Sequence, residues 1–426
     1  MDYCKKIIYL IGYILFVNWL FIEYVSTTWG YLGAYSTFSR IGLSWSLFFS
    51  LIPGLFLVRN DNLSVSKVIV LLLYYYTYVP MIVVISYKIT SNNLIYLIYA
   101  ISFSLAFLII IFFSVKNKFI HHRTYEFYLR IENIAFITFL GMLVLMFKYY
   151  SLLNFVNPFG EEIYTQRFAA RDSNLRSSSL DYLTMIISGA LLPVLLSYGI
   201  YKKKQFYILL AILSYFLLYS IAANKGYLFY IPMVYIVSLL LGTRNFLSSF
   251  LQVNILMCLF IFSASLVLQE SLIYNAFMSI FSLRFIMISG VNAANYIDFF
   301  SHHQYTYFSH INLVNLFTNS YPYGKDAIGQ VIGDYYFNTT DANYNANFLL
   351  TDGVAGGGPI LVPIIGFFVG VTLQIVNSVT YRHDIRFAAL PFSIIAVLLM
   401  NISLFTTLLS GGLLLVLIIF YFLKGI

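Results

Sequence analysis

The sequence predicts an all-α polytopic membrane protein, and two observations support that prediction. Hydrophobic residues make up 61% of the 426 residues and charged residues only 9%. Soluble domains usually carry roughly a quarter of charged residues, because their surface faces water. Apolar runs of about 20 residues, the length that crosses the hydrocarbon core of a bilayer, recur along the chain. Residues 1–426 are therefore expected to form a single membrane domain with about twelve transmembrane helices.

The positions of the apolar runs predict where these helices lie. The first run follows Lys5 and Lys6, as in a signal peptide, but it is long and no small-residue cleavage site follows it. We therefore expect it to stay in the protein as the first span. The last two spans share one apolar stretch that is interrupted at Asn401 and Ser403. The expected spans are residues 7–23, 41–58, 65–87, 93–115, 131–149, 182–200, 205–223, 226–242, 251–268, 358–380, 386–402 and 405–423.

Lysine and arginine predict the orientation, because short cytoplasmic loops hold an excess of them. With the N-terminus inside, the short outer connections hold only Arg40, Lys88 and Lys225. An even number of spans returns the C-terminus, with Lys424, to the cytoplasm. Most of the 24 lysines and arginines then lie on the inner side: Lys5, Lys6, Arg59, Lys67, Lys116, Lys118, Arg123, Arg130, Lys202, Lys203, Lys204, Arg244, Arg382, Arg386 and Lys424.

Two segments are not apolar enough to be spans, and both are expected on the outer side. They are residues 150–181 and the larger segment 269–357. Structureless connections of this length are uncommon in compact proteins unless they have a function. The activity is therefore expected to lie in these two segments.

The first outer segment contains a group of arginines in the stretch YTQRFAARDSNLR. Arg167 and Arg171 are four residues apart and would share one face of a helix, and Arg176 follows. Guanidinium groups hold phosphate oxygens in a bidentate way, so three of them beside a membrane suit a diphosphate. The alternative is a solvated helix face in which Asp172 pairs with Arg176.

The second outer segment begins with apolar and aromatic residues at helical spacing, as in an amphipathic helix lying at the membrane interface. Arg284 is the only lysine or arginine in that stretch. Asp298 and His302 are four residues apart, so the carboxylate could orient the imidazole as a general base for a sugar hydroxyl. The alternative is that His302, His303 and His310 are polar residues at the interface.

The rest of the second segment interleaves tyrosines, asparagines and aspartates, among them Asp334 and Asp352. Aromatic rings pack on sugar faces, while amides and carboxylates hydrogen-bond to hydroxyls. The composition therefore suggests a carbohydrate-binding surface. An aromatic belt at the membrane interface is the alternative.

Several common signatures are absent from the sequence. There is no phosphate-binding Gly-x-x-x-x-Gly-Lys-Ser/Thr loop, no His-Glu-x-x-His and no Cys-x-x-Cys. Asp-x-Asp, typical of soluble metal-dependent sugar transferases, does not occur. Cys4 and Cys258 form no disulfide or metal framework. No metal or cofactor is expected, and the scattered basic residues give no support to a nucleic-acid partner.

Four stretches carry a resemblance to a known family. They are YTQRFAARDSN, AANKGYLFYIPMVYIV, RFIMISGVNAANYIDFFSHHQYTYFSH and NANFLLTDGVAGGGPILVPIIGFFVG. In order and topological place they resemble the O-antigen polymerases (the Wzy type), also called oligosaccharide repeat unit polymerases. The resemblance covers most of the chain. It implies a membrane glycosyltransferase of GT-C-like architecture in the bacterial inner (cytoplasmic) membrane, with both termini in the cytoplasm.

The resemblance also implies a reaction at the periplasmic face. A glycan linked to undecaprenyl diphosphate is moved onto the sugar of a second lipid-linked repeat unit, so no nucleotide is needed. Cations must stabilise the departing diphosphate, and a base must deprotonate the acceptor hydroxyl. We expect Arg167, Arg171, Arg176 and Arg284 to bind the diphosphates, Asp298, His302 or His310 to be the base, and Asp334 or Asp352 to contact sugar or to replace the histidine.

Partners and alternatives complete the expectation. The partners are the lipid-linked donor and acceptor, the bilayer and a co-polymerase that regulates chain length. An O-antigen ligase is the nearest alternative, because it is another membrane glycosyltransferase with a large outer loop. A flippase or transporter for the lipid-linked unit is the alternative from another class. Transporters usually place their polar site near the bilayer midplane, whereas here the polar residues gather in two outer segments.

Overall fold

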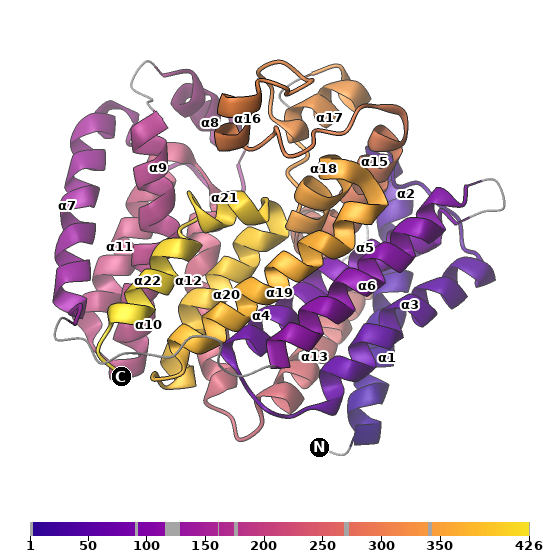
Figure 1. Ribbon diagram of the computed structural model, residues 1–426, viewed down its shortest axis with the longest axis horizontal. Coiled ribbons are helices and arrows are strands. Elements are labelled where there is room, and N and C mark those ends of the chain that lie inside the picture. Colours follow the sequence, from indigo (N-terminus) through magenta and orange to yellow (C-terminus); the bar gives the residue numbers. More distant parts are fainter. Residues whose placement is uncertain are drawn as a thin grey trace.

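The computed structural model describes residues 3–89, 93–115, 128–160, 162–173, 178–267, 272–339 and 343–425. These residues form helices joined by turns, in a bundle with a helical cap at one end (Figure 1). The helices are α1 (Tyr3–Trp19), α2 (Ser26–Trp29), α3 (Arg40–Arg59), α4 (Val65–Leu73), α5 (Val79–Ser86), α6 (Ile95–Val115), α7 (Ile131–Tyr149), α8 (Glu162–Asp172), α9 (Ser178–Ile186), α10 (Leu192–Lys202), α11 (Gln205–Ala222), α12 (Lys225–Leu241), α13 (Phe246–Val267), α14 (Leu272–Met278), α15 (Ile288–His302), α16 (Asn312–Thr318), α17 (Ile328–Phe337), α18 (Ala355–Gly357), α19 (Leu361–Thr380), α20 (Ile385–Asn401), α21 (Leu404–Leu408) and α22 (Leu413–Phe422).

Apolar helices long enough to cross a membrane account for most of the bundle. In the described part of the chain there are ten such segments. All but one lie at expected spans: Tyr3–Leu32, Arg40–Arg59, Val65–Ser86, Ile95–Ser114, Ile131–Leu152, Ser179–Lys202, Gln205–Ala222, Phe246–Val267 and Leu349–Thr380. The shorter apolar helices α12, α20 and α22 lie at the remaining expected spans. The chain is therefore a polytopic, all-helical membrane protein.

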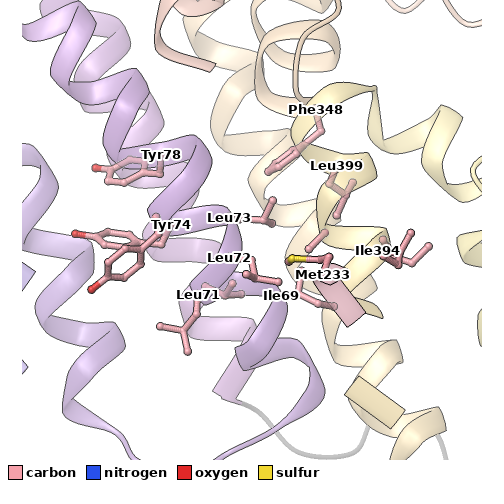
Figure 2. Packing of buried hydrophobic residues seen from close by; sticks show 14 of the residues in the cluster. Ile69, Leu71, Leu72, Leu73, Tyr74, Tyr78, Met233, Phe348, Ile394 and Leu399 are labelled. Carbon is pink, nitrogen blue, oxygen red and sulfur yellow. The ribbon is translucent and has the colours of Figure 1, made fainter. Parts of the chain in front are cut away.

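The helical segment Val65–Ser86 lies at the centre of the bundle. Every residue of α4 is buried, and Figure 2 shows Leu72 and Leu73 of α4 on the side of that helix toward Leu399 of α20. The π-helical stretch Tyr74–Tyr78 joins α4 to α5. Three of its four tyrosines are buried, and two of these, Tyr74 and Tyr78, donate hydrogen bonds of 2.7 Å to backbone carbonyls of α3. Their rings therefore fill the core without leaving these hydroxyls unpaired.

Small residues allow two of the long helices to approach closely. Gly366 of α19 lies against Ala106 of α6, where an added Cβ would be 2.7 Å from the Ala106 Cα. Inside a bilayer there is little hydrophobic driving force between helices, so van der Waals contact between closely packed backbones stabilises their association. The contact holds the helix that follows the glycine-rich break at 356–358 against the rest of the bundle.

The segment from Leu272 to His302 enters the bundle and returns to the same end, and we call it the dipping segment. Near its start, the Tyr274 ring packs on Tyr24. Further along, Ser289 donates to the carbonyl of Tyr76, halfway along Val65–Ser86. Asn295 then donates to the carbonyl of Leu32, back at the end where the segment began. By length and apolarity Ser279–His302 also qualifies as a span.

This segment corrects the expectation of an amphipathic helix lying at the interface. Nearly all of α15 is buried, including Asn292 and Asn295. Asn292 donates to the carbonyl of Asn345, and Tyr296 to that of Tyr344. The amide and hydroxyl donors that make the sequence look interfacial are thus satisfied inside the protein.

Three short helices of the expected outer segments, α8, α16 and α17, form what we call the cap. In Figure 1, α8, α16 and α17 lie at the end of the bundle opposite the two chain termini. This arrangement places the larger part of both expected outer segments together at one end.

Candidate functional site

Helix α8 is fixed to the bundle by the side chain of Gln166. This buried amide donates to the carbonyls of Leu152, Ser220 and Ile221, at 2.7, 3.2 and 3.3 Å. Two of these carbonyls belong to the last turn of α11, where intrahelical partners are lacking. Ile163, one turn earlier on α8, is buried in a small cluster with Tyr219 and Ala223. One face of α8 is thereby held against the end of α11.

The turn after α11 positions Arg167. Ala223 ends α11 in the left-handed conformation, with φ of 48°, which an L-residue adopts only at an energetic cost. Its carbonyl accepts a 3.0 Å hydrogen bond from the Arg167 Nε. Because Nε is used in this way, the terminal nitrogens of the guanidinium remain for a ligand.

Lys225 begins the next helix, two residues after Ala223. Asn224 caps α12 by accepting a hydrogen bond from the Gly226 amide at 3.0 Å. The cap fixes the start of α12 and therefore the place of Lys225. A helix N-terminus also carries partial positive charge, which adds to that of the lysine.

Arg284 reaches the same place from the segment that dips into the bundle. Its Nη2 donates to the hydroxyl of Tyr164 in α8, with 3.5 Å between the two atoms. The guanidinium of Arg167 lies 5.9 Å from the centre of the same ring. We call Arg167, Lys225 and Arg284 the cation cluster, and Tyr164 lies among them.

The electrostatics of Tyr164 show that all three cations act on one point. The hydrogen bond from Arg284 lowers the pKa of the Tyr164 phenol, and the charges of Arg284, Lys225 and Arg167 lower it further. Burial lowers the pKa of Arg167, and repulsion from Arg284 adds to that effect. Within the described residues, none of the three cations forms an ion pair with a carboxylate. Among the described residues, the cluster is therefore a region of positive charge without a compensating carboxylate.

An anion is the ligand that such a region can hold. Two guanidinium groups and an ammonium offer many donors to the oxygens of a diphosphate. They come from three separate elements, so a single ligand would contact α8, α12 and the dipping segment together. Among the described residues, no group of three histidine, cysteine, aspartate or glutamate side chains gathers to hold a metal ion.

The expected pairing of the Asp298 carboxylate with His302 does not form. The His302 Nδ1 lies 3.0 Å from the backbone carbonyl of Asp298 instead, and the carboxylate accepts a 2.7 Å hydrogen bond from the Tyr336 hydroxyl. Residues four apart share a helix face, but here the imidazole of His302 contacts the backbone carbonyl of Asp298 and not its carboxylate. The Ser301 hydroxyl also lies 2.9 Å from this Nδ1, so among the described residues Nδ1, and not Nε2, is the ring nitrogen with hydrogen-bond partners. His302 is exposed.

His310 and Asp352 form a buried pair, although they are 42 positions apart in the sequence. The His310 Nε2 lies 3.2 Å from Asp352 Oδ1, with side-chain exposures of 6% and 0%. On the other side of the ring, Nδ1 lies 2.8 Å from the Thr306 hydroxyl. The second Asp352 oxygen accepts from the Leu404 amide at 2.6 Å. Both imidazole nitrogens and both carboxylate oxygens are thus engaged within the protein.

The remaining residues expected at the site lie elsewhere or outside the description. Asp334 is exposed on α17 in the cap. Arg171 belongs to α8, but its side chain lies outside the described residues, as does the whole of Arg176. In the described structure, no hydrogen bond or ion pair joins Asp298, Asp334 or Asp352 to the cation cluster.

Sequence reasoning missed two residues of this site, Lys225 and Tyr164. Lys225 appeared only as one of three cations in short outer connections, where lysine and arginine are depleted. That depletion was the signal that could have selected it. Tyr164 had no signal, because it is one of 38 tyrosines.

No protein-family model matches the chain, and no curated protein or solved structure matches it. Its class is therefore defined by the fold and the site alone. It is a multi-pass helical membrane protein with a cluster of three cations that, in the part of the chain the structure describes, has no carboxylate partner, at the end of the bundle opposite its termini.

Proposed function

We propose that this protein is a membrane glycosyltransferase of the O-antigen polymerase type, acting at the outer face of the membrane on glycans linked to a lipid diphosphate. The observation that supports the proposal best is the cation cluster. Arg167, Lys225 and Arg284 surround the Tyr164 hydroxyl without a carboxylate partner in the described residues. A diphosphate at the membrane surface matches this charge, and the dipping segment and α8 supply one guanidinium group each.

The proposed reaction forms one glycosidic bond and breaks one bond to phosphate. The acceptor hydroxyl attacks the anomeric carbon of the donor glycan, and the bond from that carbon to the diphosphate oxygen breaks. The electron pair leaves with the lipid diphosphate, whose growing negative charge the cation cluster stabilises. The hydroxyl proton goes to a base. The free energy comes from the lipid diphosphate donor itself, so the reaction consumes no nucleotide.

His302 fits the role of base better than the other histidine and aspartates. Its Nδ1 faces the Asp298 carbonyl and the Ser301 hydroxyl, its Nε2 has no hydrogen-bond partner among the described residues, and the side chain is exposed. A ring nitrogen without a partner can accept a proton. His310 lacks a free ring nitrogen because Thr306 and Asp352 engage both. We therefore assign Asp352 and His310 a structural role in this proposal.

Single substitutions in the cation cluster test the proposal. Arg167→Ala, Lys225→Ala and Arg284→Ala should each reduce long-chain polysaccharide about 10- to 100-fold, because a hydrogen bond to a charged group contributes on the order of 1.5–3 kcal/mol. The readout is the ladder of surface polysaccharide on a gel, from a deletion strain that carries each variant. His302→Gln should reduce the ladder similarly.

Arg40→Ala is the matched control, since Arg40 is an exposed arginine at the start of α3 and outside the cluster. It should leave the ladder unchanged at equal protein levels. Normal ladders from all three cluster variants would remove the cluster from the site. The proposal also requires that the deletion strain carries a single repeat unit on its core. Bare core would instead indicate a ligase, and repeat units retained on the inner leaflet would indicate a flippase.

A further inference from the structure

A second polar cavity lies at the opposite end of the bundle. It has a volume of about 300 Å³ and is lined by Asn60, Asn62, Ser64, Lys67, Ser114 and Phe56, among others. This is the end that holds both chain termini (Figure 1), because Lys6 in α1 forms an ion pair with Asp61 beside the cavity. The cavity is therefore separate from the cation cluster in the cap.

Lys67 is the unusual residue of this cavity. Its side chain is 95% buried, with 5% of the residue exposed, and its ammonium nitrogen has no hydrogen-bond partner in the described structure. Burying a charge without a partner is costly, and a lysine at this depth is rare unless it is paired. The four-carbon stem is flexible, so rotation about its own bonds can turn the ammonium into the cavity.

The surroundings of Lys67 favour a negatively charged ligand. Lys67 lies in the first turn of α4, whose cap Ser64 accepts a hydrogen bond from the Lys67 amide at 3.2 Å. The positive end of the helix dipole therefore adds to the lysine charge. Asp61 is the nearest acid that acts on Lys67, but it is already paired with Lys6. Among these three described side chains, the Lys6–Asp61 pair is neutral overall, and the charge of Lys67 is left without an acid of its own.

We propose that this cavity binds a phosphate group through the Lys67 ammonium, with the hydroxyl and amide groups of Ser64, Asn60 and Asn62 as further donors. The ammonium of Lys67 can pair with the single negative charge of a phosphodiester. Phe56, which lines the cavity, has 56% of its surface exposed on the outside of the bundle. Such an apolar edge can contact acyl chains, so the headgroup of an anionic phospholipid is the source of phosphate that fits best. Free phosphate is the other source.

Native mass spectrometry of the purified full-length protein tests this site. The protein is exchanged into detergent with phosphatidylglycerol, with phosphatidylcholine, or with inorganic phosphate and no added lipid. We expect the wild type to retain one phosphatidylglycerol more than Lys67→Met. Lys67→Arg should keep that lipid, because it keeps the charge. Lys202→Met is the matched control, since Lys202 is an exposed lysine outside the cavity, and it should behave as the wild type.

The samples with lipid and with inorganic phosphate distinguish a phospholipid ligand from free phosphate. A thermal shift with inorganic phosphate that is lost in Lys67→Met would support the site with free phosphate as its ligand. Equal retention of phosphatidylglycerol by the wild type and Lys67→Met, without a Lys67-dependent phosphate shift, would overturn the proposal. Lys67→Met keeps the aliphatic stem and removes a buried charge, so it should fold, and size-exclusion chromatography checks this. No step of the test depends on glycosyl transfer.

Discussion

Tyr164 lies near all three residues of the cation cluster, so its ionisation depends on each of them. Arg284 donates to its hydroxyl, and Lys225 and Arg167 add their charges. Positive charge favours the phenolate, which holds the pKa of Tyr164 below its ordinary value of 10.0. The same phenolate would repel an anionic ligand. Ionisation of Tyr164 and binding of a diphosphate are therefore expected to oppose each other.

This opposition gives a prediction about pH. Arg284→Gln should raise the pKa of Tyr164, because it removes the hydrogen bond and the nearest charge. Pyrophosphate should bind more weakly as the pH rises through the pKa of Tyr164. The measurement is the tyrosinate absorbance of the wild type minus that of Tyr164→Phe, with and without pyrophosphate. An identical titration for Arg284→Gln and Arg40→Gln would contradict the shared electrostatics.

The buried pair of His310 and Asp352 gives a prediction about stability. Asp352→Ala should lower the free energy of unfolding by about 3–5 kcal/mol, because it leaves a buried histidine and the Leu404 amide without a partner. Thermal unfolding in detergent measures this. Asp334→Ala, at an exposed aspartate of the cap, is the control and should change stability by less than about 0.5 kcal/mol. Loss of activity in Asp352→Ala at unchanged stability would argue for a direct role in the reaction.

The sequence allowed part of the site to be predicted. Arg167 and Arg284 were expected to act together because both lie in outer segments, and the structure brings both to Tyr164. The Asp298–His302 pairing was wrong, since helical spacing brings two residues near each other but does not choose between a carboxylate and the main chain. The contact of His310 with Asp352 spans 42 positions, and only the tertiary fold determines it.

Among the elements, α15 depends on one glycine for its packing against α5. An added Cβ at Gly290 would be 2.4 Å from the carbonyl oxygen of Pro80, so the backbone would have to move. Pro80 lies in the first turn of α5. A side chain at this position would therefore force α15 and α5 apart.

Gly290→Ala should lower the free energy of unfolding by about 1–3 kcal/mol, as overpacking of a filled core usually does. Gly12→Ala in α1 is the matched control, because its Cβ would only touch the Ile255 side chain at an ordinary 3.4 Å. Thermal unfolding of both variants measures the difference. Equal stability of the two would contradict the close approach of α15 and α5.

The elements that the sequence predicted and those that it missed differ in polarity. Continuous apolar runs such as 65–87 and 251–268 marked spans, and the structure places apolar helices there. The segment 272–302 was missed because its asparagines, serines and histidines lower its hydropathy. Those residues bond to carbonyls of neighbouring segments, as Asn295 does to Leu32. A single sequence does not show such partners.

For the whole molecule, the return of the Leu272–His302 segment to the end where it began matters for topology. A segment that dips and returns adds no crossing. The number of crossings then remains even, and both termini lie at one end, as Figure 1 shows. The cap with α8, α16 and α17 lies at the other end. The distribution of lysine and arginine predicts that the terminal end is cytoplasmic.

A native cysteine can test this orientation. Cys4 is exposed at the terminal end, whereas Cys258 is buried and should not react. A membrane-impermeant maleimide added to intact cells should leave the wild type unlabelled and should label Phe317→Cys, which introduces a thiol at a highly exposed position of α16. After the membrane is permeabilised, Cys4 should react as well. Labelling of Cys4 in intact cells would reverse the orientation and place the cation cluster in the cytoplasm.

The three positive charges of the cation cluster around Tyr164 also affect how a bound anion dissociates. The two guanidinium groups and the ammonium repel one another, and a bound anion reduces that repulsion. An outgoing anion is therefore expected to leave most readily when another takes its place. Turnover would then proceed by displacement, with each arriving lipid diphosphate expelling the spent one, and its rate would rise with the supply of fresh substrate.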